Sequence, residues 1–215
     1  ALTRVLSVVV WYHFAFFAIS LALLGTGFGA LCVHLGARRW PALRSELACS
    51  LASVVQGVST LVVAILLTHV TPDWFGGLSG AFTIFTGRLV TVFAAMLVPF
   101  CAGGVVLATA VLMHAQRADR VYFADLVGAG LGCLVAIPLL SWFGGVRALA
   151  LAGSIGTLCA LGWALAPAST TRRTRVLVAA ASLAVLQLGV ARSPWLELRV
   201  AKGIDLSQAR PELSR

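Results

Sequence analysis

The sequence predicts an all-α protein that crosses a membrane repeatedly, a polytopic bundle of about six helices with a short polar C-terminal tail. Two observations carry this prediction. Of the 215 residues, 60% are hydrophobic and 11% are charged, and the mean hydropathy is +0.99. A soluble domain is about 45–50% apolar and about 25% charged. The few charges also lie between uncharged runs, most of which approach or exceed the roughly 20 residues that span a bilayer.

The runs, which are uncharged except for one acidic residue in the fourth, set the bounds of the expected elements. Residues 1–192 should form the bundle, and residues 193–215 a polar tail or linker. The six expected spans are residues 5–35, 47–70, 89–113, 121–143, 148–166 and 176–190. These runs exceed the roughly 9–11 residues of a membrane strand and do not alternate in polarity, so we expect helices.

The second and third spans are joined by an unusual stretch. Residues 74–87 are uncharged and rich in glycine and phenylalanine. Their number suits a partly buried loop, or an interfacial or re-entrant piece, better than a full span. Two prolines, Pro99 and Pro138, lie inside the third and fourth spans and should kink them.

The second span carries a stripe of small and polar residues, made of Ser50, Ser53, Gly57 and Thr60. Hydroxyl groups inside a membrane helix find partners on neighbouring helices. We therefore expect interhelical hydrogen bonds along this stripe. A solute path is the alternative.

In the fourth span, Ala124, Gly128 and Gly132 recur every four residues. This small-xxx-small pattern lets membrane helices approach closely and predicts a packing face. A phosphate-binding loop would require a preceding strand and a helix N-terminus in water, and the sequence predicts neither here.

The same span holds Asp125, the only acidic residue inside an expected span. An ionised carboxylate in hydrocarbon is costly and is usually paired. Arg120 or the nearby Arg117 is the candidate partner, and a charge at the helix N-terminus is the alternative role.

Among the four histidines, only His13 is expected to lie deep in the bilayer, within the aromatic segment WYHFAFF. Its imidazole is the candidate cofactor ligand, for haem or chlorophyll. A hydrogen bond to a neighbouring helix is the simpler expectation, and the chain is expected to hold no cofactor or metal.

No catalytic set emerges from the sequence. The five cysteines are scattered through apolar runs without the grouping that zinc or iron–sulfur sites require. The net charge of +9 comes from basic residues spread between the spans. Such residues meet lipid headgroups, so we expect the lipid bilayer as partner and no nucleic acid.

Three segments resemble bacterial multi-pass proteins of the spermidine synthase-like (polyamine aminopropyltransferase-like) family. They are VLSVVVWYHFAFFAISLALLGTGFGAL (residues 5–31), RVYFADLVGAGLGCLVAIPLL (residues 120–140) and KGIDLSQA (residues 202–209). The resemblance implies a membrane bundle that precedes a cytosolic Rossmann-like domain. That domain's nucleotide loop and acidic substrate residues would follow residue 215, so no residue here inherits a catalytic role. The chain is then expected to be part of a longer protein.

The leading functional expectation is a non-catalytic membrane module that anchors a C-terminal soluble domain and presents substrate to it. The alternatives are a structural subunit of a membrane protein complex and a small-solute transporter. The resemblance implies a bacterial inner membrane with the tail in the cytoplasm. The short loops after spans one, three and five oppose that orientation, because they carry more arginine than the short loops on the other side.

Overall fold

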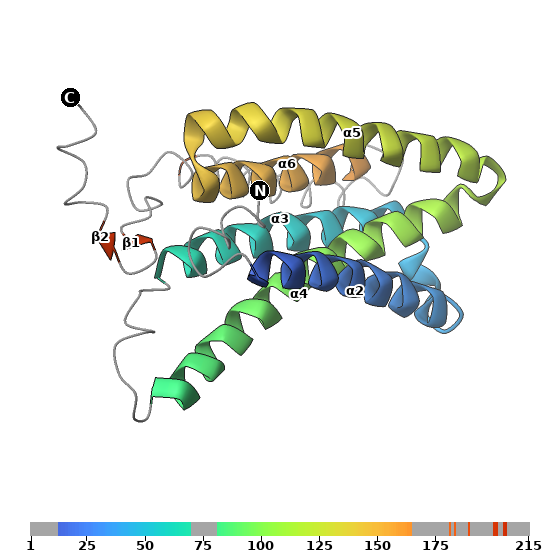
Figure 1. The fold of residues 1–215 in the computed structure, drawn as a ribbon. Coiled ribbons are helices and arrows are strands. Elements are labelled where there is room, and N and C mark those ends of the chain that lie inside the picture. The colour runs from blue at the N-terminus through green and yellow to red at the C-terminus, as the bar shows by residue number, and fades with distance from the viewer. Residues whose placement is uncertain are drawn as a thin grey trace.

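The computed structural model describes residues 13–69 and 81–164, together with residues 181, 183, 189, 200–201 and 204–205. Five long helices occupy the first two ranges (Figure 1). They are α2 (His13–Gly36), α3 (Glu46–His69), α4 (Ala81–Met113), α5 (Ala118–Phe143) and α6 (Gly145–Ala164). Each contains a stretch long and apolar enough to cross a membrane. The predicted bundle of helices is therefore confirmed for this part of the chain, with five helices that are long and apolar enough to span a membrane.

The bounds agree closely with four of the predicted spans. The second, fourth and fifth differ from α3, α5 and α6 by at most three residues at either end, and the first ends one residue before α2 does. Residues 5–12 of the first span lie outside the described ranges. Of the sixth span, the structure describes only Ala181, Leu183 and Gly189, which are helical, so a count of six is not confirmed.

The helix that contains the third span begins before the span does, whereas its apolar stretch, Val90–Met113, agrees with the predicted residues 89–113. α4 starts at Ala81 and continues through Pro99 to Met113, a length of 33 residues. The second half of the supposed loop or re-entrant piece, residues 81–87, is therefore the first part of this helix. The prediction used Arg88 as a boundary, but arginine is a good helix former, so a single charge does not end a helix.

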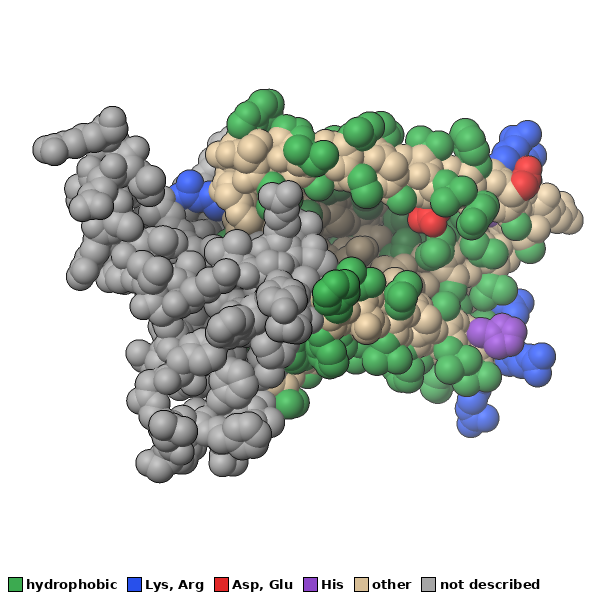
Figure 2. All heavy atoms as spheres, in the orientation of Figure 1, with side chains coloured by type: hydrophobic (Ala, Val, Ile, Leu, Met, Phe, Trp, Pro, Cys, Tyr) green, Lys and Arg blue, Asp and Glu red, His purple; other side chains and the backbone are tan. Residues whose placement is uncertain are grey.

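The helices pack unequally. α3 makes its most extensive contacts with α6 and α4, and α2 lies against α4. α5 touches α6 and α4 only sparsely and runs along the outside of the bundle (Figure 1). Between α5 and the helices below it the molecular surface is hollowed (Figure 2).

The connections that the structure describes lie at the two ends of the bundle. The short 3-10 helices η1 (Pro41–Leu43) and η3 (Ala115–Arg117) lie at one end, and α5 turns into α6 at the other (Figure 1). That turn is made by Gly144, with φ 76°, a value that costs little only for glycine. Its N–H donates to the carbonyl oxygen of Leu140 at 3.1 Å, which closes the end of α5.

The main cluster of buried hydrophobic side chains lies in the half of the bundle nearest the α5–α6 turn. Its largest buried side chains are Leu67, Met96 and Val63, and the first residues of α6, from Val146, complete it. Large hydrophobic side chains elsewhere, including Leu23, Leu134 and Ile137, are exposed. An apolar exterior around a modest core is what a bundle solvated by lipid requires.

The polar tail contains the only strands in the part of the chain that the structure describes. β1 (Val200–Ala201) and β2 (Ile204–Asp205) pair antiparallel, with Val200 opposite Asp205. They lie at the end of the bundle where α5 turns into α6 (Figure 1). The sequence predicted only a polar tail or linker here, so this short hairpin is an addition. The two strands do not belong to a membrane barrel.

Candidate functional site

The polar stripe of α3 faces α6. The Ser50 hydroxyl donates to the carbonyl oxygen of Ala160 at 2.9 Å, and both residues are fully buried. Ser53 is also buried, whereas the Thr60 hydroxyl donates within its own helix to Gln56. The predicted interhelical hydrogen bond is confirmed at Ser50. Because α6 fills the space beside the stripe, the structure gives no support to a solute path there.

The closest approach of α3 and α6 is at glycines. A Cβ placed on Gly57 would lie 2.5 Å from the carbonyl oxygen of Gly153 and would overlap the Thr157 hydroxyl. A Cβ on Gly153 would in turn lie 2.8 Å from the carbonyl oxygen of Gly57. Each backbone therefore occupies the place that a side chain would take on the other helix. This is the small-residue packing expected of membrane helices.

A second glycine contact joins α2 and α4. A Cβ on Gly25 would lie 2.6 Å from the Cβ of Phe100, and one on Gly29 would overlap the backbone of Cys101. Gly104 of α4 similarly meets the backbone of Thr26. The sequence offered these α2 glycines no packing partner, because nothing in one apolar run says which other run it meets.

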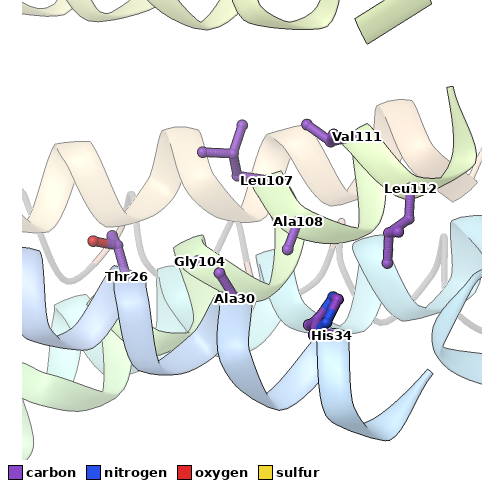
Figure 3. Close-up of a pocket in the computed structure, with 8 residues that line it drawn as sticks. All are labelled: Thr26, Ala30, His34, Gly104, Leu107, Ala108, Val111 and Leu112. Atoms are coloured by element: carbon purple, nitrogen blue, oxygen red, sulfur yellow. The ribbon is translucent and has the colours of Figure 1, made fainter. Parts of the chain in front are cut away.

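Next to this contact is a groove of ≈ 370 Å³ between α2 and α4. It is lined by Thr26, Ala30, His34, Gly104, Leu107, Ala108, Val111 and Leu112 (Figure 3). The small residues at its floor leave the space open, while the leucine and valine side chains form its wall. Such a lining suits a flexible apolar group better than a polar solute.

The polar groups of the groove are few. The Thr26 hydroxyl already donates to the carbonyl oxygen of Ala22 at 2.8 Å. His34 carries the one titratable side chain in the lining and lies near the end of α2. No reaction can be assigned to one imidazole, but it can donate a hydrogen bond to a polar head at the mouth of the groove.

The end of the bundle beyond His34 is basic. Arginine and histidine side chains gather there (Figure 2). Arg38, Arg39 and Arg44 lie between α2 and α3, and Arg117 and Arg120 lie around the start of α5; all five are exposed. This arrangement matches the predicted contact of basic loops with lipid headgroups. The opposite end carries Arg147, whose side chain is partly buried.

The predicted packing residues of α5 stand apart from the rest of the chain. Ala124, Gly128 and Gly132 are exposed, and a Cβ on either glycine would meet nothing within 4 Å. No described residue of α5 is buried. The pattern therefore has no partner helix within the described ranges, and its role in packing stays a prediction.

The predicted ion pair also involves α5. Asp125 and Arg120 are both exposed, and the structure records no ion pair between these two described residues. They are five residues apart on one helix, so their side chains leave it in directions about 140° apart, whereas contacts on one helix form at spacings of three or four. Their own helix therefore does not bring them together.

The structure describes the remaining candidate ligand residues only in part. His13 is the first residue of α2, and its side chain lies outside what the structure describes, so a haem or chlorophyll ligand there stays untested. Among the described residues, no three His, Cys, Asp or Glu side chains group as metal ligands. The five cysteines are free thiols; Cys49 is buried, Cys101 is half-buried, and Cys32, Cys133 and Cys159 are exposed.

The structure thus contains an apolar groove, two glycine contacts and a basic end. It also contains one helix, α5, with an open face, the uncovered face formed by Ala124, Gly128 and Gly132. The groove was missed by the sequence analysis because it exists only where two particular helices cross. A comparison of this chain with protein-family models, curated proteins and solved structures finds no match.

Proposed function

We propose that the chain is a non-catalytic membrane module that anchors a soluble domain or a partner subunit in the bilayer. The observation that carries this proposal is the distribution of side chains over the described helices. Large apolar side chains are exposed along α2 and α5, while the exposed arginines of the described loops stand at one end. Such a surface is stable when lipid surrounds it. It offers little favourable binding energy to partners other than lipid.

Anchoring is better supported than presentation of a substrate. The groove ends at His34, toward the basic end, whereas β1 and β2 lie at the opposite end (Figure 1). A molecule held in the groove would be separated from a domain following the tail by about the thickness of the bundle. The groove instead suits an acyl chain, with a lipid headgroup near the arginines.

The alternative functions, a transporter and a structural subunit, have less support from the described residues. A transporter needs a polar path, and the stripe on α3 that suggested one is packed against α6. A structural subunit with a pigment depends on His13, whose side chain lies outside the described ranges. The spermidine synthase-like assignment stays a prediction carried by the three resembling segments. It would be strengthened by a nucleotide-binding domain encoded after residue 215.

Expression of the chain with a soluble fluorescent protein fused after Arg215 tests the anchoring role. We expect fluorescence to remain in the membrane pellet after alkaline carbonate washing, while the fluorescent protein alone stays in the supernatant. Release of the fusion by carbonate would reject the proposal. Turnover of aminopropyl or methyl donors by the purified 215-residue chain would reject its non-catalytic part.

The side of the membrane that the tail faces has a separate test. Under this proposal the tail is cytoplasmic, as a domain using a nucleotide-derived cosubstrate requires, although the five exposed arginines at the opposite end weigh against it. A single cysteine at Ser207, in a variant whose native cysteines are replaced, should not react with a membrane-impermeant maleimide in intact cells. Reaction there would reverse the orientation and remove the link to a cytosolic enzyme.

A further inference from the structure

The open face of α5 has a charge on each side. On a helical wheel the face formed by Ala124, Gly128 and Gly132 is centred near Gly128, with Asp125 about 60° to one side and Arg120 about 80° to the other. All five residues are exposed, so the part of the chain that the structure describes does not cover them. An uncovered acid on a helix that crosses lipid is costly unless a cation reaches it.

Two copies of the same helix complement each other across this face. Copies inserted in one membrane have the same orientation, so two α5 helices related by a twofold axis run parallel. In such a parallel pair, the left edge of one helix's contact face lies against the right edge of its partner's contact face. A residue on the left edge of one copy therefore meets a right-edge residue of the other copy. This relation joins g and e positions of parallel coiled coils, which are five residues apart, the same spacing as Arg120 and Asp125.

We propose that the protein forms a symmetric dimer through α5, in which Arg120 of each copy pairs with Asp125 of the other. The small residues allow the two backbones to approach closely at Ala124 and Gly128. The axial offset of five residues is about 7.5 Å, which a long arginine side chain spans between closely packed helices. The two pairs form together, so each copy's acid receives the cation that its own helix cannot supply.

A second copy fits this surface better than an unrelated helix, because the charges are self-complementary about the small-residue face. Another protein would have to present a cation and an anion in the mirror arrangement. The proposal depends on α5 crossing the membrane and does not depend on the anchoring role. Failure of one therefore leaves the other standing.

Disulfide crosslinking in membranes tests the contact. In a variant whose native cysteines are replaced, a cysteine at Ala124 should give a covalent dimer on mild oxidation, because a disulfide needs Cα atoms within about 7 Å. A cysteine at Leu126, about 200° around the same helix, is the matched control and should give little dimer. Equal yields at the two positions, or no dimer at Ala124, would overturn the proposal.

Charge reversal tests the pairing itself. With the cysteine at Ala124, Arg120→Asp alone and Asp125→Arg alone should each lower the dimer yield several-fold, because like charges then meet. When the two variants are co-expressed with tags of different size, the mixed dimer should recover to near the original yield. A mixed dimer no more abundant than either self-dimer would overturn the pairing. If a reversed variant does not accumulate, Arg120→Gln and Asp125→Asn should each lower the yield, and an unchanged yield would count against the proposal.

Discussion

The hydroxyl of Ser50 on α3 donates a hydrogen bond to the backbone carbonyl oxygen of Ala160 on α6, although the residues are 110 positions apart in the chain. Both residues are fully buried. A helical carbonyl oxygen has a second lone pair, so Ala160 accepts this bond in addition to its helical one. The contact fixes α6 against α3 at a defined height, because a sliding movement of either helix would break it.

Removal of this hydroxyl should weaken the contact. We expect Ser50→Ala to lower the free energy of unfolding by about 0.6 kcal/mol, the average for interhelical hydrogen bonds in membrane proteins. Titration with sodium dodecyl sulfate in mixed micelles measures this. Ser59→Ala is the control, because the Ser59 hydroxyl donates to Val55 within its own helix. An equal loss in both variants would show that the interhelical bond is not responsible.

Two glycines with different surroundings should respond oppositely to alanine. Gly57→Ala should cost about 1–3 kcal/mol, because the new methyl group meets the backbone of Gly153. Gly27→Ala should be neutral or stabilising by up to about 1 kcal/mol, since a Cβ there meets nothing within 4 Å and alanine favours a helix. The same titration separates them. A destabilised Gly27 variant beside a tolerant Gly57 variant would contradict the described packing.

Thr109 of α4 is fully buried, and its hydroxyl has no hydrogen-bond partner in the described structure. A buried polar group without a partner costs about 1–3 kcal/mol. Thr109→Val should therefore leave stability unchanged or raise it. Thr157→Val is the comparison, because the Thr157 hydroxyl donates to Gly153 at 2.9 Å, and its loss should cost about 0.5–1.5 kcal/mol. Thermal unfolding in detergent can rank the two, and a clear loss at Thr109 would contradict the prediction.

Cysteine reactivity should report burial. Cys49 lies near the start of α3 and is fully buried, whereas Cys32, near the end of α2, and Cys159, near the end of α6, are exposed. All three lie toward the same end of the bundle, so their depth in a micelle is similar. We expect N-ethylmaleimide to modify Cys32 and Cys159 in the folded protein and Cys49 only after unfolding. Mass spectrometry of peptides identifies the modified sites.

The sequence predicted the helices better than their contacts. Hydropathy placed α3, α5 and α6 to within three residues at either end, because the cost of a charge in lipid is a property of each run alone. It placed the apolar stretch of α4 but did not show that the helix begins before Arg88, because a charge interrupts hydropathy without interrupting backbone hydrogen bonds. Helix ends need a change in backbone geometry, and a charge does not supply one.

The sequence predicted that helices would pack closely at small residues, but it did not predict which small residues make the contacts. The four-residue pattern at Gly128 stands out in the sequence, yet the described chain leaves that glycine uncovered and makes its close contacts at Gly57 and Gly153. Both kinds of glycine obey the same steric rule. Which of them finds a partner depends on how the helices are arranged, and lipid-exposed and buried apolar residues look alike in a sequence.

The unequal lengths of α4 and α6 make the surrounding lipid part of the protein's energetics. The apolar stretch of α4, Val90–Met113, has 24 residues and extends about 36 Å, whereas that of α6, Gly145–Trp163, has 19 residues and extends about 29 Å, close to the thickness of the hydrocarbon core. A thicker bilayer would shelter more of α4 while stretching past α6, and a thinner one would do the reverse. The most favourable bilayer thickness therefore lies between the thicknesses that suit the two helices separately. Acyl-chain length should therefore shift stability and partition the protein between regions of unequal thickness.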